Sequence, residues 1–159
     1  MAITSILGDM FSVNMSMQSM DEQVLRNIKR ANIKLDHMID VNNHLIEQGR
    51  STKAELIVGL PGETSESFID GLNNILNSNS SSVTIYTLMM LNGTEFKNPS
   101  YRKKFGYEGK FRIVPLNFGE YNNERIFDYE EVGVITKDMS FDDYLYLRVM
   151  ALFVESLHN

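Results

Sequence analysis

The chain has 159 residues, of which 43% are hydrophobic and 23% charged, a composition typical of one globular domain with a real core. Its net charge of −6 argues against nucleic acid as the main partner, and no stretch approaches the roughly 20 apolar residues of a membrane span. The chain contains no cysteine, which excludes thiolate catalysis, disulfides and cysteine-ligated clusters within it. With no signal-peptide pattern at residues 1–9, we expect a cytoplasmic protein.

The first half of the sequence alternates between strand and helix patterns. Residues 11–17 alternate apolar and polar side chains, which predicts a strand. Asp21 is placed to cap a short helix, and a second helix follows that Gly49 can end. Residues 54–60 form an apolar run broken only by Glu55, which favours a strand buried on both faces of a parallel sheet.

The turn at residues 61–64 leads into another helix, for which Thr64 or Ser65 is the expected N-cap. Residues 83–91 then predict a third strand, closed by Asn92-Gly93-Thr94. This order of elements predicts an α/β fold with parallel strands and right-handed crossovers.

The pattern weakens after residue 95. Residues 99–105 predict a short helix that Gly106 ends, and residues 132–136 a short strand. Between them, residues 107–128 are polar and aromatic without a clear period, which indicates a functional loop or an extension. Ser140 is the expected cap of a long C-terminal helix whose apolar residues lie on more than one face, so we expect part of the protein to cover it.

Three polar residues near predicted strand or helix ends are candidates for a binding site. A carboxylate within a buried strand costs several kcal/mol unless it is paired, so Glu55 either pairs with a structural Arg or Lys or accepts hydrogen bonds from ligand hydroxyls. Gln18, at another strand end, poses the same choice. Arg30 is either an exposed helix end or reaches inward to a carboxylate.

Other patterns carry less weight. The Gly59-Leu60-Pro61-Gly62 turn precedes a helix N-terminus but lacks the features of a phosphate loop, so a tight turn is the better interpretation. His37, Asp40 and His44 share a helical face, which we interpret as a solvated face rather than a metal site. The basic run at residues 102–104 is interpreted as a solvated helix end.

Taken together, these residues resemble the C-terminal half of the radical S-adenosylmethionine (radical SAM) barrel. The resemblance rests on residues 16–19, on the leucine-bearing helix ending in Arg30, and on the run Glu55-Leu56-Ile57-Val58-Gly59-Leu60-Pro61-Gly62-Glu63-Thr64. These are similar to the fourth and fifth strands of the branch that contains coproporphyrinogen oxidases, methylthiotransferases and cobalamin-dependent radical enzymes, and residues 83–89 resemble the sixth. The implied fold is a partial TIM-like (β/α) barrel in residues 1–96, followed by a family-variable extension in residues 97–159.

The resemblance also implies roles for individual residues. Gln18 and Glu55 would hydrogen-bond the ribose hydroxyls of SAM, and Arg30 would pair with its carboxylate. Leu88 and Met89 would lie along the adenine, with Ile57 in the layer beneath. Ser16 and Tyr86 would point into the barrel if the strand phase is as predicted.

The chain departs from the family pattern in one decisive respect and one minor one. Family members bind a [4Fe-4S] cluster through a three-cysteine loop after the first strand, and neither cysteine nor that loop occurs here. Asn92 stands where many members have proline. We therefore expect a fragment that is inactive alone, with the cluster-bearing half of the barrel as its partner and the substrate unknown.

The predicted half-barrel would leave parallel strand edges unpaired, which is costly. Self-association into a homo-oligomer, or compensation by the long C-terminal helix, would relieve that cost. Two other interpretations of the chain stay open at this point. One is a non-catalytic α/β interaction or scaffold domain that has lost the cofactor, and the other is a nucleotide-binding domain that uses the helix start at residues 62–64.

Overall fold

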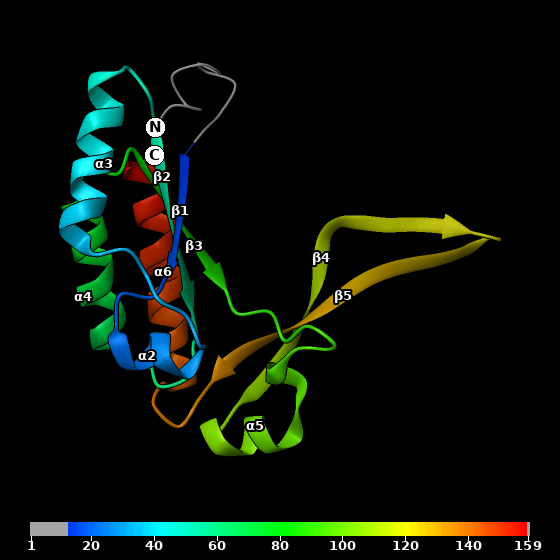
Figure 1. Ribbon diagram of the computed structural model, residues 1–159. Coiled ribbons are helices and arrows are strands. Elements are labelled where there is room, and N and C mark those ends of the chain that lie inside the picture. The colour runs from blue at the N-terminus through cyan, green and yellow to red at the C-terminus, as the bar shows by residue number, and fades with distance from the viewer. Residues whose placement is uncertain (1–12, 159) are drawn as a thin grey trace.

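The computed structural model describes residues 13–158 of the chain, which form a small parallel sheet, its covering helices and a long antiparallel hairpin (Figure 1). Residues 11 and 12 of the first predicted strand lie outside the described residues. In chain order the elements are β1 (Val13–Gln18), α2 (Glu22–Asn27), α3 (Leu35–Glu47), β2 (Thr52–Val58), α4 (Ser65–Leu76), β3 (Ser82–Thr87), the 3-10 helix η2 (Glu95–Lys97), α5 (Pro99–Phe105), β4 (Glu108–Tyr121), β5 (Glu124–Ile135) and α6 (Phe141–His158).

The three strands predicted in the first half form one parallel sheet in the order β1-β2-β3. Its register places Glu55 of β2 between Ser16 of β1 and Thr84 of β3. The predicted helices that connect these strands are also present, so the prediction of a parallel α/β unit is confirmed. Helix caps follow the sequence as well, because the side chains of Asp21 and Thr64 accept hydrogen bonds from the first turns of α2 and α4.

The two faces of this sheet have different environments. Along β2, Ala54, Leu56 and Val58 are buried, whereas Lys53, Glu55 and Ile57 alternate with them and are only half-buried. The prediction of a strand buried on both faces is therefore wrong. Helices α3, α4 and α6 cover only the face of Leu56 (Figure 1). We call the other side the open face, and it carries Ser16, Lys53, Glu55, Ile57, Thr84 and Tyr86.

The main core lies between the covered face of the sheet and the three helices. Apolar side chains of all three strands meet Met38 of α3, Phe68 and Leu72 of α4, and Leu147 of α6 there. A smaller core, which includes Leu60, Leu88 and Phe105, holds α5 and the segment after β3 against α2. Burial of these side chains stabilises the fold by about 1.5–3 kcal/mol for each large one.

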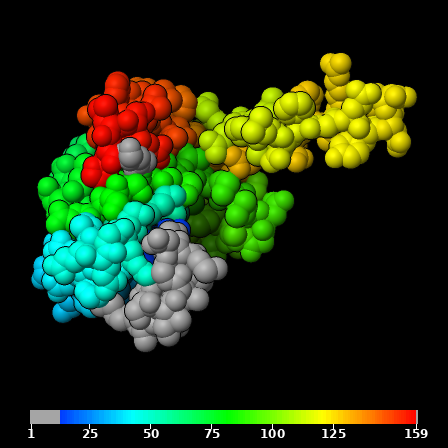
Figure 2. Space-filling model, turned by 90° about the horizontal axis from the view of Figure 1, so that it is seen from above, coloured from blue at the N-terminus to red at the C-terminus, as the bar shows by residue number. Residues whose placement is uncertain are grey.

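The segment expected to be irregular is instead a two-stranded antiparallel ribbon that projects away from the rest of the molecule (Figure 2). Its turn is Asn122-Asn123, and both residues have positive φ, 51° and 63°, as a tight primed hairpin turn requires. Large apolar residues, among them Phe111, Phe118 and Tyr129, stay exposed along the ribbon. Because neither face of its outer part is covered, the sequence there lacks the alternation between buried and exposed sides that would have revealed the strands, and only the base of β5, with Val132 and Val134, enters the main core.

The outer edge of β3 is closed by the C-terminal helix. The Arg148 guanidinium donates to the Ile85 carbonyl at 2.8 Å, and the Ile85 N–H donates to the Glu155 carboxylate at 2.7 Å. These are backbone groups that another strand would otherwise bind. Compensation by the C-terminal helix, one of the two predicted ways to relieve an unpaired edge, is thus present at β3.

Helix α6 is covered on one side only. Leu147 and Ala151 are fully buried against the sheet, whereas Leu152 is 64% exposed and Phe153 61% exposed. The expectation that something covers this helix is therefore met on its inner side alone. Within residues 13–158, no helix combines the length and the apolar character needed to cross a bilayer.

Candidate functional site

Glu55 lies near the middle of the open face, and three side chains from all three strands converge on it. The Ser16 hydroxyl of β1 donates to Glu55 Oε2 at 2.5 Å. The Lys53 ammonium lies 3.6 Å from Oε1, and the Tyr86 hydroxyl of β3 lies 3.5 Å from the same oxygen. The pairing of Glu55 with a lysine, one of the two alternatives that the sequence left open, is thus present. Its hydrogen bonds to ligand hydroxyls stay a prediction.

The two oxygens of the Glu55 carboxylate are bound to different extents. Oε2 is engaged by a short hydroxyl hydrogen bond, whereas both contacts to Oε1 are longer than the usual 2.7–3.2 Å. An ionised carboxylate offers about four lone-pair positions. Oε1 therefore keeps the capacity to accept a hydrogen bond from a ligand hydroxyl, while Ser16 fixes the opposite oxygen.

Gln18 ends β1 in an unusual backbone conformation. Its φ is +64°, in the left-handed region that non-glycine residues rarely adopt, and the register with β2 shifts between Ser16 and Gln18. The shift pairs Gln18 with Leu56, so that two β1 residues lie opposite one of β2. Bulges of this kind are frequent beside binding sites, where they redirect a side chain. Gln18 itself is half-buried at this strand end.

Arg30 lies close to the same strand. Its guanidinium donates to the backbone carbonyl of Ser16 at 2.5 Å, which ties the chain after α2 to β1. The residue is exposed. The structure thus brings Arg30 to the backbone of Ser16, whose side chain bonds to Glu55, and the predicted pairing of Arg30 with a carboxylate stays a prediction.

The three apolar site candidates lie in different environments. Ile57 follows Glu55 on the open face and packs against the smaller core. Leu88 is only 5% exposed within that core, where its backbone exchanges hydrogen bonds with Val58 and Gly133. Met89 is 42% exposed and bridges to Val132 of β5. Of this pair, Met89 is thus the more accessible, and the adenine contacts of all three residues stay predictions.

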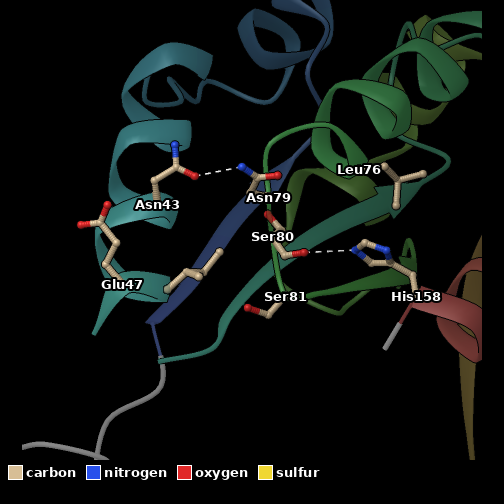
Figure 3. Close-up of a pocket in the computed structure, with 8 residues that line it drawn as sticks. Asn43, Glu47, Leu76, Asn79, Ser80, Ser81 and His158 are labelled. Carbon is tan, nitrogen blue, oxygen red and sulfur yellow. Dashed lines mark hydrogen bonds between the residues drawn. The ribbon is translucent and has the colours of Figure 1, made fainter. Parts of the chain in front are cut away.

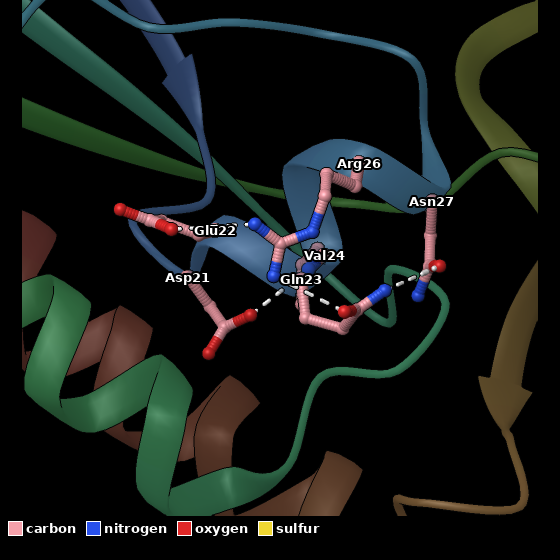
Figure 4. A network of polar contacts seen from close by, with 6 residues as sticks. All are labelled: Asp21, Glu22, Gln23, Val24, Arg26 and Asn27. Carbon is pink, nitrogen blue, oxygen red and sulfur yellow. Dashed lines mark hydrogen bonds and ion pairs between the residues drawn. The ribbon is translucent and has the colours of Figure 1, made fainter.

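Helix α2, which lies between β1 and Arg30, is short but stabilised by several side-chain hydrogen bonds (Figure 4). Asp21 accepts from the Val24 N–H at 2.9 Å, and Arg26 bonds to both Glu22 and Gln23 on the exposed side. At its end, the Asn27 amide donates to the Pro61 carbonyl at 2.8 Å. Asn27 thereby ties α2 to the loop between β2 and α4.

That loop also contains a buried carboxyl group beside the site. Glu63 is 1% exposed, and its Oε1 accepts a hydrogen bond from the Ser19 hydroxyl at 2.5 Å, whereas Oε2 is buried without a hydrogen-bond partner among the described residues. Burial is the main cause that raises the pKa of Glu63 to about 8; the Ser19 bond opposes it and the Asp21 charge adds to it. Burial thus favours the protonated form of Glu63, and the bond with Ser19 joins the end of β1 to the loop after β2.

A second carboxylate secures the base of the hairpin. Glu131 of β5 accepts hydrogen bonds from Lys97 and, at 2.8 Å, from Arg102. Burial by itself raises the pKa of Glu131, but the bonds from the two cations outweigh it and lower the pKa below its usual value. Lys103 and Lys104 are exposed as predicted, whereas Arg102 is not, so the interpretation of this basic run as a solvated helix end is wrong for Arg102.

The remaining candidate features lie away from the open face. His37, Asp40 and His44 are exposed on α3, in agreement with a solvated face, and residues 13–158 contain no group of three potential metal ligands. A hollow of about 640 Å³ lies between the ends of α3, α4 and α6. His158 contacts the Ser80 carbonyl there (Figure 3). Its lining residues precede β3 or end helices, so it lies at the opposite end of the strands from Gln18 and Glu63.

Two functional candidates were missed by reasoning from sequence. Lys53 stands two residues before Glu55, and the period of a strand would have placed both on one face if the strand had been interpreted as half-open. Glu63 resembled an ordinary turn residue, and its burial depends on Ser19, which is 44 residues away. Only the first of these two residues therefore left a signal in the local sequence.

Comparisons with known proteins relate this chain to a family, although no family model matches it. The cobalamin-dependent radical SAM methyltransferase TokK from Streptomyces tokunonensis is 34% identical over 107 residues, 67% of this chain and 15% of TokK. The 2-(S-pantetheinyl)-carbapenam-3-carboxylate methyltransferase of Streptantibioticus cattleyicolor is 29% identical over 154 residues, 94% of this chain and 22% of that enzyme.

Among solved structures, coproporphyrinogen III oxidase from Escherichia coli, a radical SAM enzyme, matches with a TM-score of 0.43 and 29% identity over 47% of this chain and 17% of its own. The chain thus spans less than a quarter of each curated relative that it matches. The family predicted from the sequence is confirmed by the two methyltransferases. The chain belongs to the radical S-adenosylmethionine superfamily.

Proposed function

We propose that the open face and the carboxyl end of β1 form the SAM cradle of a radical SAM enzyme. The three-stranded sheet would be the fourth to sixth strands of a partial (β/α) barrel, with the open face turned toward its interior. The parallel order β1-β2-β3 and the placement of helices on the opposite face support this arrangement.

The observation that carries the proposal is the hydrogen bonding of the Glu55 carboxylate. Its Oε1 lies on an accessible face with room for further hydrogen bonds, while Ser16 holds Oε2 in place. A pair of vicinal ribose hydroxyls suits such an acceptor, and the Gln18 amide at the neighbouring strand end offers both a donor and an acceptor. Arg30 would supply the charge for the SAM carboxylate. The residues present thus fit the polar groups of SAM.

The iron–sulfur cluster, unlike SAM, has no ligands in this chain. This chain has no cysteine with which to bind it, so the cluster would lie in another part of the enzyme. In the family, reduction by this cluster supplies a 5′-deoxyadenosyl radical from SAM. The role of the present chain would be to bind and orient SAM and to form the substrate side of the barrel.

The two curated relatives narrow the reaction class. Both are named as methyltransferases, one as cobalamin-dependent and the other as acting on a pantetheinyl carbapenam carboxylate. We assign methyl transfer to the enzyme to which this cradle belongs. The chain alone would be inactive and would bind SAM weakly.

Calorimetric titration of the chain with SAM tests the cradle. We expect binding that the Gln18→Ala/Glu55→Ala variant reduces by about tenfold or more, because each substitution removes hydrogen bonds to a ribose hydroxyl. Glu66→Ala, on the exposed first turn of α4, is the matched control and should bind like the wild type. Absent binding, or equal binding by the double variant, would support a non-catalytic α/β interaction domain instead.

A further inference from the structure

Lys53 shares the open face with Glu55, two positions earlier on β2. Its ammonium lies 3.6 Å from Glu55 Oε1 and 5.9 Å from the centre of the Tyr86 ring. The side chains of Lys53 and Glu55 are 33% and 19% exposed, so both groups are partly removed from water. Among residues 13–158, Lys53 is the cation with which Glu55 forms an ion pair. The arrangement is a small charged cluster on an otherwise accessible face.

The distances indicate how this cluster acts. At 3.6 Å the ammonium attracts the carboxylate, but the separation exceeds that of a normal N–H···O hydrogen bond. Lys53 therefore restrains Oε1 by charge attraction without occupying its lone pairs. Ser16 restrains Oε2 from the neighbouring strand with a short hydrogen bond. The carboxylate is thus held at both oxygens, with one of them still able to accept.

We propose that Lys53 is a positioning residue of the cradle, which holds Glu55 Oε1 ready for ligand hydroxyls without contacting the ligand itself. The inference rests on the proposed function, since it concerns how the same site binds SAM. Because Lys53 already restrains Glu55 Oε1, less conformational entropy is lost when a ligand binds there. Lys53 therefore contributes to affinity only through the hydrogen bond between Glu55 and a ligand hydroxyl.

If Lys53 acts only through Glu55, the effect of removing its charge should depend on whether the ligand has ribose hydroxyls. Removal of the Lys53 charge should weaken binding of SAM, whose ribose hydroxyls meet Glu55. It should not change binding of a SAM analogue that lacks the 2′- and 3′-hydroxyls. A lysine that contacted the carboxylate or the adenine of SAM would instead affect both ligands equally.

The test is calorimetric titration of the 159-residue chain with both ligands. Lys53→Met keeps the length of the side chain and removes its charge, and we expect about three- to tenfold weaker SAM binding with unchanged binding of the analogue. Lys53→Gln should behave in the same way, and Lys53→Arg should restore most of the affinity. Lys103→Met, on the exposed side of α5, is the control. In a Glu55→Gln background, Lys53→Met should have no further effect.

The outcomes separate this inference from the function on which it rests. If the wild-type chain binds no SAM, the proposed function and the inference fall together. If SAM binds and Glu55→Gln weakens it while Lys53→Met does not, the inference alone is overturned. Equal weakening of both ligands by Lys53→Met also overturns it, because Lys53 then acts on the ligand directly or on the fold.

Discussion

The buried Glu63 carboxyl makes the stability of this protein depend on pH in an unusual direction. The pKa of Glu63 is about 8 in the folded chain, mainly because of burial, compared with an ordinary value of 4.5. At a pH between 4.5 and 8, Glu63 holds its proton in the folded chain and has lost it in the unfolded chain, so the folded chain binds one more proton. The free energy of unfolding should therefore fall by about 1.4 kcal/mol per pH unit as the pH rises through this range. The total loss is about 5 kcal/mol, complete above pH 8.

The assay is urea unfolding followed by far-ultraviolet circular dichroism at intervals from pH 5 to pH 9. Glu63→Gln keeps the acceptor for the Ser19 hydroxyl and removes the titrating group. We expect its unfolding free energy to lie close to that of the wild type at pH 5 and well above it at pH 8. Glu66→Gln removes an exposed carboxylate three residues later and serves as the matched control, with the slope of the wild type.

Parallel stability curves for the wild type and Glu63→Gln would refute the reasoning. Such a result would mean that Glu63 titrates equally in the folded and unfolded chains. The loop after β2 would then not be held to β1 by a protonated carboxyl group.

Three further outcomes follow from contacts in the structure. Gln18→Gly should raise the free energy of unfolding by about 1 kcal/mol, because it relieves a left-handed backbone, and should weaken SAM binding; denaturation and calorimetry measure the two effects. Arg102→Ala should cost about 3 kcal/mol in urea unfolding, because it removes one of the two cations that neutralise the buried Glu131. The Arg148→Ala/Glu155→Ala variant should self-associate in light scattering, because it exposes the backbone edge of β3.

The first two of these outcomes have a control within the chain. Lys29→Gly relieves a similar positive φ of 56° but lies outside β1, so it should leave SAM affinity unchanged. Lys103→Ala, beside Arg102 but exposed, should change stability by less than about 0.5 kcal/mol. The argument for Gln18 would be contradicted if Gln18→Gly were stabilised without losing SAM affinity. The argument for Arg102 would be contradicted if Arg102→Ala unfolded with the free energy of the wild type. A monomeric Arg148→Ala/Glu155→Ala variant would contradict the argument for the edge of β3.

Much of the candidate site could be anticipated from local patterns. Gln18 ends a strand in which apolar and polar residues alternate, Glu55 interrupts the apolar run of the next strand, and Arg30 follows a capped helix. These signals depend on the residue and its near neighbours, so they survive in a single sequence. The same holds for the parallel order of the strands, since helices separate them along the chain.

The hairpin and the partners of buried charges could not be anticipated in the same way. Both faces of the outer part of the β4–β5 ribbon are exposed and carry aromatic residues, so burial imposed no periodic pattern there, whereas Val132 and Val134 at its base are buried. The Asn122-Asn123 turn was the one local signal of a hairpin. Arg102 was misinterpreted because its partner, Glu131, lies 29 residues later on another element.

The sequence by itself determined the family, the parallel α/β unit and the identity of the polar residues near the strand ends. The tertiary structure decided which face of the sheet stays open and which groups surround Glu55 there. It also decided that Glu63 is buried beside Ser19 and that α6 closes the edge of β3. The physical reason is that secondary structure follows local periodicity and capping, whereas burial and charge pairing are set by residues that only folding brings together.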